Sequence, residues 1–266
     1  MKSDVYRTIE HLKSRYSTLS KQHKAIARFL MENPSAVLSM GIDDFAAAVG
    51  VSRATVFRFC KELGFGGYTE LQRNFSALRP MIEVPIVSSH FKWVATAMYD
   101  AIYYSLQHVD LEAFQKAVEL MTRAKRLYWF GAGESGMMGE IANHRCWHLG
   151  IDSYVFRETL DLTRFSMLRD QESVFIFLSV SGEGSYLVKP LEMVKRENLT
   201  VIAVTSRHFS PLTETAAVVL HAASPRAVLG GSVIPVKAGF EAIVNALLYE
   251  TAQARGIPLK LTTEMF

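Results

Sequence analysis

Five short runs of β-branched and aromatic residues alternate with helix-like stretches from residue 126 onward, and this alternation constrains the fold most. Such short apolar runs are typical of buried strands, and strands separated by helical segments favour βαβ units, which build a parallel sheet. We therefore predict an α/β domain with helices over 90–122 before the sheet and a closing helix over about 237–255, ended by Gly256 and Pro258. The expected strands are RLYWF (126–130), SYVF (153–156), SVFIFLS (173–179), TVIAVTS (200–206) and AVVLHAA (217–223).

Charge divides the 266-residue chain unevenly. Residues 1–80 hold 12 Lys/Arg and 7 Asp/Glu, giving +5, whereas the remaining residues carry −2 and bring the chain to +3. A basic segment joined to a near-neutral one is typical of a nucleic-acid-binding head, although a solvated basic surface has the same signature. The stretch RPMIEVPIVSS has two prolines and no helical stripe, so we place a linker at 81–89, between a domain at 1–80 and one at 81–266.

The sequence lacks the features of secreted and membrane-spanning proteins, which indicates the cellular compartment. Cys60 and Cys146 form neither a CxxC pair nor a disulfide framework, which favours a reducing environment. No apolar run reaches the roughly 18–20 residues that span a membrane, and the first residues lack the apolar core of a signal peptide. We expect a cytoplasmic protein without a membrane partner.

Residues 42–61, IDDFAAAVGVSRATVFRFCK, fit a helix-turn-helix. Ala46 is small where two helices approach, and Gly50 stands at the turn, where a positive φ is often needed. Ser52 is suited to cap the second helix. On a helical wheel, one side of that helix is apolar and should face the core, through Val56, Phe59, Cys60 and Leu63.

The opposite face of this second helix is the one that such a motif lays in the major groove. Arg53 and Arg58 have the geometry for bidentate bonds to guanine edges. Ala54 or Thr55 can touch a thymine methyl group, and side chains such as Lys61 suit phosphates. The predicted DNA-binding set is Ser52, Arg53, Ala54, Thr55, Phe57, Arg58 and Lys61. A plain helical hairpin with solvated arginines is the alternative.

Two loops rich in glycine and hydroxyl groups follow expected strands. YWFGAGESGMMGE (128–140) leads into a helix near Ser135, and FLSVSGEGSYLVK (177–189) repeats the order of strand, small-residue loop and helix. A helix start favours an anion, and the carboxyl ends of parallel strands meet at the edge where ligands of open α/β sheets bind. We therefore expect both loops to converge on one phosphate. The predicted ligand-binding set is Gly133, Glu134, Ser135, Ser179, Ser181, Gly182, Gly184 and Ser185.

Two other readings of these segments stay open. Gly131, Gly133 and Gly136 also spell G-x-G-x-x-G, so a dinucleotide site with an acidic partner at Asp152 or Glu158 competes, although it does not account for the second loop. The second alternative is that the two segments are a pair of ordinary turns between strands and helices.

Three polar residues recur on one helix face, at Glu140, His144 and His148. Their spacing can hold a metal, but a polar face with an internal Glu–His contact is commoner. We therefore predict neither a metal nor a cofactor.

Both halves together resemble the RpiR-type family of bacterial transcriptional regulators, over nearly the whole chain. The likeness rests on VSRATVFRFCKELGFGGY (51–68) in the head and on FGAGES (130–135) and SVSGEG (179–184) beyond it. It implies an all-α helix-turn-helix head joined to an α/β domain of the SIS (sugar isomerase) type, a three-layer αβα sandwich with a five-stranded parallel sheet. It also implies an effector that is usually a phosphorylated sugar or sugar acid.

The family's phosphate motifs carry over with one departure. Its G-x-G-x-S serine corresponds to Ser135, and the two serines of its S-x-S-G-x-T loop correspond to Ser179 and Ser181. The threonine position is occupied by Gly184, and Ser185 would point about 100° away on a helix. We therefore expect a phosphate loop that lacks one hydroxyl, with more room beside Gly184 for a larger or differently placed effector.

These observations predict a cytoplasmic regulator of sugar-metabolism genes that binds a double-stranded operator as a homodimer or homotetramer and responds to a phosphosugar. Glu241, on the closing helix, lies where isomerases of this fold sometimes place an acid or base. No paired base is readable at a matching spacing, so we predict no catalytic residue. A phosphosugar isomerase with a DNA-binding head, and a regulator whose SIS domain only mediates assembly, are the alternatives.

Overall fold

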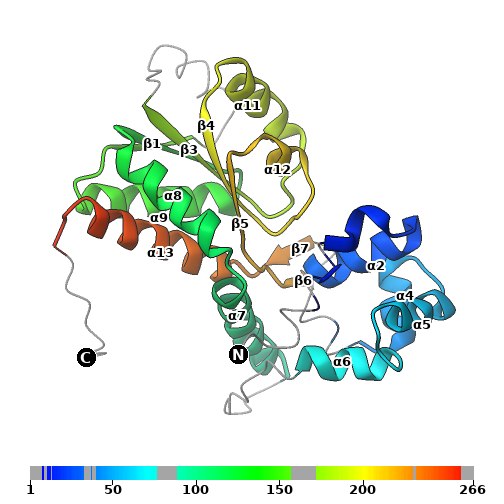
Figure 1. The fold of residues 1–266 in the computed structure, drawn as a ribbon. Coiled ribbons are helices and arrows are strands. Elements are labelled where there is room, and N and C mark those ends of the chain that lie inside the picture. The colour runs from blue at the N-terminus through cyan, green and yellow to red at the C-terminus, as the bar shows by residue number, and fades with distance from the viewer. Residues whose placement is uncertain are drawn as a thin grey trace. The chain divides into compact units, whose positions relative to one another are not determined.

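The computed structural model describes residues 8, 11–12, 14–32, 37, 40–76, 89–156, 172–229 and 232–258. The chain falls into two compact units, whose elements are labelled in Figure 1. The first unit joins Met1–Asp100 with Pro225–Val236, and the second joins Ala101–Ser224 with Lys237–Phe266. The expected linker at 81–89 lies outside the described residues except for Ser89, which begins a helix. The boundary at residue 80 therefore stays a prediction.

The described residues before 77, called the head below, are helical. Leu12, Ile26, Phe45, Phe59 and Phe75 are among the side chains that form its core. Val56 and Cys60 join them and Leu63 packs against them, as the helical wheel predicted. The elements of the head are the 3-10 turn η1 (Tyr16–Thr18) and the helices α2 (Lys21–Glu32), α4 (Ile42–Val49), α5 (Arg53–Glu62) and α6 (Tyr68–Ser76).

The turn between α4 and α5 has the expected chemistry. Gly50 has φ 75°, in the left-handed region, which ends α4 at little steric cost. The backbone N–H of Val51 donates to the Ala46 carbonyl at 2.9 Å and satisfies one of the last groups of the helix. Ser52 then caps α5, because its hydroxyl accepts from the Thr55 backbone N–H at 3.2 Å.

The second unit is built on a five-stranded sheet with the order β2-β1-β3-β4-β5. Every neighbouring pair in it is parallel, which confirms the predicted parallel sheet. The first three strands have the bounds expected from the sequence, and the last two are shorter by one to three residues. The strands are β1 (Arg126–Phe130), β2 (Ser153–Phe156), β3 (Ser173–Ser179), β4 (Thr200–Thr205) and β5 (Val218–His221).

Helices cover both faces of this sheet, so the unit is a three-layer αβα sandwich (Figure 1). Along β3, Val174 and Ile176 enter the core under α8, α9 and α13, whereas Phe175 and Phe177 enter the core under α11 and α12. This alternation follows from the period of two along a strand. The five helices are α8 (Leu111–Arg123), α9 (Glu134–His148), α11 (Ser185–Arg196), α12 (Pro211–Thr215) and α13 (Ala238–Ala254).

Two segments differ from the secondary structure that the sequence predicted. The helical stretch expected over 90–122 is divided into α7 (Ser89–Gln107) and α8, because Asp110 caps α8 by accepting from the backbone N–H of Glu112 at 3.0 Å. An unpredicted antiparallel hairpin, β6 (Arg226–Leu229) with β7 (Ser232–Pro235), precedes α13. Most described side chains of β7 are exposed, so its sequence carries no alternation of apolar and polar residues.

Two further observations concern the cysteines and the length of the helices. Cys60 and Cys146 are buried and unpaired, and burial raises the pKa of the Cys60 thiol to about 11. Among the described residues, no helix combines the length and the apolar character that crossing a bilayer requires.

Candidate functional site

The face of α5 opposite the core is exposed and basic. Arg53, Ala54, Arg58 and Lys61 are exposed, and Phe57 is 45% exposed. The Lys61 Nζ atom lies 5.4 Å from the centroid of the Phe57 ring, a cation–π distance that orders both side chains. The outward direction of Ala54, Arg58 and Lys61 agrees with the helical wheel, and the exposed Phe57 ring adds an apolar surface beside the positive charges.

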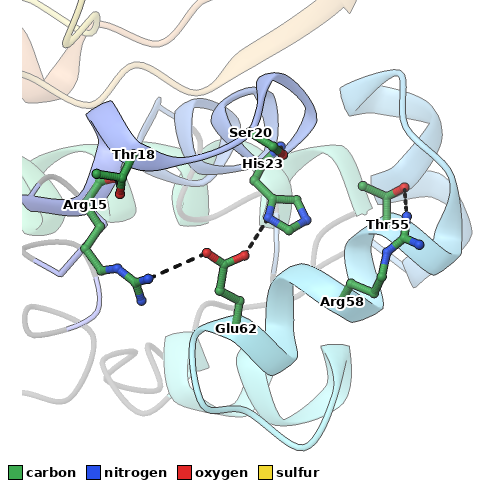
Figure 2. A network of polar contacts seen from close by, with 7 residues as sticks. All are labelled: Arg15, Thr18, Ser20, His23, Thr55, Arg58 and Glu62. Carbon is green, nitrogen blue, oxygen red and sulfur yellow. Dashed lines mark hydrogen bonds and ion pairs between the residues drawn. The ribbon is translucent and has the colours of Figure 1, made fainter.

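Thr55 departs from the prediction. Its side chain is almost fully buried, at 2% exposure. Its Oγ1 atom lies 2.8 Å from the Ser52 hydroxyl and accepts from Arg58 Nη2 at 3.4 Å (Figure 2). Thr55 therefore supports the cap and orients Arg58, and its methyl group is not placed to touch a thymine.

An open groove of about 1140 Å³ lies beside this face. Besides the α5 residues, the turn at Gly66 and Gly67 and the start of α6 line it, which sequence reasoning missed. The available signal was the GFGGYTE run, where two glycines precede a helix. Arg53, Arg58 and Arg73 all line the groove, so it suits a polyanion.

Glu62, the last residue of α5, connects this helix to α2 through His23. Its Oε2 atom accepts from His23 Nδ1 at 2.7 Å, and its Oε1 atom lies 3.8 Å from Arg15 Nη2 (Figure 2). His23 also packs edge-on against Phe59, with ring centroids 5.4 Å apart. These contacts hold the orientation of the exposed basic face.

The first glycine-rich loop lies between β1 and α9. A Cβ atom at Gly131 would lie 2.7 Å from the backbone carbonyl of Ser135, so the loop folds closely against the first turn of α9. Gly133 has φ 55° and directly precedes the helix. Ser135 is 6% exposed in this turn, and Glu134 beside it is exposed.

Lys237, which precedes α13, reaches this helix start. Its Nζ atom donates to the Ser135 hydroxyl at 2.6 Å. Burial lowers the pKa of the Lys237 ammonium below its ordinary value of 10.5, while the charge of Glu134 acts in the opposite direction. An ammonium, a hydroxyl and the N–H groups of a helix start are the groups that bind phosphate. Sequence reasoning missed Lys237, because no local spacing connects residues 102 positions apart.

The second loop, between β3 and α11, has its hydroxyls engaged. Ser179 is 1% exposed, and its Oγ atom accepts from the Gly182 N–H at 3.1 Å and lies 2.7 Å from Tyr186 Oη. Ser181 donates to the Glu183 carbonyl at 2.8 Å. Ser179 therefore organises the loop from beneath, whereas Ser181 is half-exposed at its surface.

The expected room beside Gly184 is not there. A Cβ atom on Gly184 would lie 2.7 Å from Tyr186 Cε1, so the Tyr186 ring fills that space. Gly184 also has φ 133°, a conformation that side-chain-bearing residues rarely adopt. Ser185 is exposed at the first position of α11. The departure at position 184 therefore changes the loop without enlarging it.

The two loops begin at the same edge of the sheet. β1 and β3 are paired in parallel, with Phe130 opposite Phe177, and each strand runs directly into its loop. The structure thus brings the loops to the carboxyl edge, where ligands of open α/β sheets bind. Which of the predicted residues touch a ligand stays a prediction.

The competing site readings receive no structural support. Asp152 accepts from Arg126 Nε at 2.8 Å, so it is engaged in an ion pair, and Glu158 lies outside the described residues. His144 and His148 bond each other through their Nε2 atoms at 3.1 Å. In the described part of the chain, no three His, Cys, Asp or Glu residues form a group that could hold a metal.

Comparisons with known proteins match both units. Residues 6–77 match the helix-turn-helix domain of the rpiR family, and residues 120–248 match the SIS domain. A Haemophilus influenzae protein described as an uncharacterized HTH-type transcriptional regulator is 26% identical over 237 residues, covering 84% of this chain and 82% of that protein.

Two solved structures share the fold. The sugar isomerase domain of an RpiR transcription factor from Sphaerobacter thermophilus is 26% identical, with a TM-score of 0.58, over 64% of this chain and 93% of that one. The NanR protein of Vibrio vulnificus, complexed with ManNAc-6P, is 21% identical, with a TM-score of 0.56, over 94% of this chain and 95% of that one.

Proposed function

We propose that this chain, which belongs to the RpiR-type family of transcriptional regulators, binds an operator through α5 and responds to a phosphosugar at the carboxyl edge of its sheet. The role of transcriptional regulator follows from the paired helix-turn-helix and SIS domains and from the regulators among its relatives. We propose the contacts with the operator, the class of effector and the site at which the effector binds.

The bond between Lys237 and Ser135 carries the choice of an anionic effector. The ammonium lies at the N-terminal end of α9, where the helix dipole also favours negative charge. A lysine ammonium and the N-terminal end of a helix are both groups that favour a phosphate. The complex of NanR with ManNAc-6P supports a phosphosugar, because that protein shares the fold over most of its length.

The head supports a major-groove contact by α5. Arg53 and Arg58 are the side chains proposed to read guanine edges, with Ala54 as an apolar contact and Lys61 and Ser52 at phosphates. Regulators with such heads usually read two half-sites as symmetric oligomers, so we propose a homodimer or homotetramer acting on genes of sugar metabolism.

A regulator is favoured over an isomerase by the engagement of the candidate acid. Glu241 accepts from Arg145 Nη2 at 3.1 Å and so serves the contact between α13 and α9. Aldose–ketose isomerisation needs a positioned base beside the sugar carbons. We therefore propose that the sheet edge binds its sugar without turning it over.

Thermal unfolding of the full chain against a panel of sugar phosphates and their unphosphorylated sugars tests the effector. A phosphosugar at about 100 times its Kd should add about 2.7 kcal/mol of stability, and its unphosphorylated form should add none. Lys237→Met should abolish that gain, because it removes the ammonium and keeps the apolar stem. Absence of any phosphate-dependent gain contradicts the proposed effector, and turnover of a sugar phosphate contradicts the non-enzymatic role.

A further inference from the structure

Tyr186 occupies an unusual position for the second residue of a helix. Instead of pointing away from the strand-end loop, it folds back over it, and its Oη atom lies 2.7 Å from the Ser179 hydroxyl. The same ring lies against Gly184, where an added Cβ would meet Cε1 at 2.7 Å and Cδ1 at 3.0 Å. Tyr186 therefore connects the buried floor of the loop with its exposed rim.

Gly184 and Tyr186 depend on each other. A side chain at position 184 would collide with the Tyr186 ring and would also be strained at φ 133°. Conversely, only a glycine leaves the ring this place. A loop can thus carry a hydroxyl-bearing residue at position 184 or this tyrosine, but not both in the observed arrangement.

The hydrogen-bond pattern around Ser179 allows the tyrosine to donate its proton to a ligand. A serine hydroxyl has one proton and accepts on its lone pairs. Ser179 Oγ accepts from the Gly182 N–H and keeps a second lone pair, so either hydroxyl can be the donor in its contact with Tyr186 Oη. When Ser179 is the donor, the Tyr186 proton is left for another acceptor. Ser179 is 1% exposed, whereas Tyr186 is half-buried, so the tyrosine is the more accessible of the two hydroxyl-bearing side chains.

We infer that Tyr186 is a ligand-binding residue that donates its phenolic hydrogen bond to the phosphate group of the effector, replacing the hydroxyl that Gly184 lacks. This inference rests on the proposed phosphosugar site. It assigns Ser179 a positioning role, because that serine orients the phenol and does not itself face the ligand. The loop thereby keeps a full set of donors with a different chemical group.

Calorimetric titration with the best-binding sugar phosphate of the panel, and with inorganic phosphate, tests the inference. Tyr186→Phe removes only the hydroxyl and keeps the ring against Gly184. Its affinity for both probes should fall about tenfold or more, because a hydrogen bond to a charged group is lost. Tyr249→Phe is the matched control, since Tyr249 is 42% exposed on α13, about 18 Å along the helix from Lys237.

The outcomes separate this inference from the function on which it rests. If the unaltered chain binds neither probe, the proposed effector fails and Tyr186 fails with it. If the unaltered chain binds and Tyr186→Phe binds equally well or more tightly while remaining folded, only the role of Tyr186 is overturned. If Tyr186→Phe unfolds at a lower temperature than Tyr249→Phe, the phosphate affinity of Tyr186→His is measured instead. That variant keeps a hydrogen-bond donor on its ring. Recovery of affinity supports donation, and no recovery contradicts it.

Discussion

Lys237 is the side chain whose protonation we expect to determine which ligands the proposed strand-end site holds. Its ammonium is partly withdrawn from water and points at Ser135, so it attracts an anion more strongly than a solvated lysine would. The same burial lowers the pKa of the ammonium, so Lys237 loses its proton at a lower pH than a solvated lysine does. A single residue therefore connects ligand affinity to pH, and it does so with a sign that can be worked out.

The second ionisation of a phosphate lies at about pH 6. Phosphosugar affinity should be greatest above that pH and should decline at alkaline pH. The decline follows because only the protonated Lys237 attracts the dianion, and burial lowers its pKa below the ordinary 10.5. Lys237→Arg should bind at neutral pH and lose the alkaline decline, since an arginine stays charged. Affinity measured against pH for both chains is the check, and identical alkaline profiles contradict the role of Lys237.

Arg58 is the clearest residue-scale test of the operator contact. Its guanidinium is oriented by Thr55 and lines the groove of the head. Arg58→Ala should weaken binding to an operator selected from random double-stranded DNA by about 1–3 kcal/mol and relax the preference at one base pair. Arg28→Ala removes the same charge from an exposed position on α2 and should change operator affinity less. Equal losses in the two variants argue for a general charge effect only.

At the scale of elements, periodicity and turn chemistry predicted most of the second unit. The β-branched runs gave three strands at their observed bounds, because buried strands need continuous apolar sequence. The hairpin of β6 and β7 was not predicted, because most described side chains of β7 are exposed and its sequence shows no alternation of apolar and polar residues. The sequence predicted the two loops of the candidate site at the ends of their strands. The contacts of Lys237 and Tyr186 depend on side-chain direction and distant sequence, which local spacing does not contain.

The close approach of the first loop to α9 predicts a sharp effect of one methyl group. Gly131→Ala would place its Cβ 2.7 Å from the Ser135 backbone, so the start of α9 must shift. We expect a loss of about 1–3 kcal/mol in stability from this overpacking, together with loss of phosphosugar binding. Gly67→Ala is a matched control, because its Cβ meets only Phe57 at an ordinary 3.5 Å. Chemical denaturation and calorimetry measure both, and unchanged binding in Gly131→Ala contradicts the placement of the site.

The loop before α11 offers a test of two coupled positions. Gly184→Thr should destabilise the chain, whereas Gly184→Thr with Tyr186→Val should recover part of that loss, because the ring no longer opposes the new side chain. Residues in contact typically show coupling of about 0.5–3 kcal/mol in a double-mutant cycle. Denaturation of the single and double variants measures the coupling, and additive losses show that the two positions act independently.

At the scale of the whole molecule, the two proposed binding functions, of DNA and of a phosphosugar, depend on different physical interactions. Residues 1–80 carry a net charge of +5 and the rest of the chain −2, so the affinity of the head for DNA should fall steeply with salt as counterions are released. The sheet edge uses a few enclosed donors, which salt screens less. A regulator needs these two functions to be coupled, and a ligand can shift an equilibrium only by its differential affinity for the two states.

Coupling of this kind is reciprocal. If a phosphosugar changes operator affinity by a given factor, the operator must change phosphosugar affinity by the same factor. Calorimetric titration of the phosphosugar into the free chain and into the chain saturated with operator, at one fixed salt concentration, measures the second factor. Operator titrations with and without phosphosugar measure the first. Lys237→Met should keep its operator affinity and lose the response, which assigns the effect to the strand-end site. If phosphosugar affinity is the same with and without operator, the two functions are uncoupled, and the sheet edge does not regulate the head.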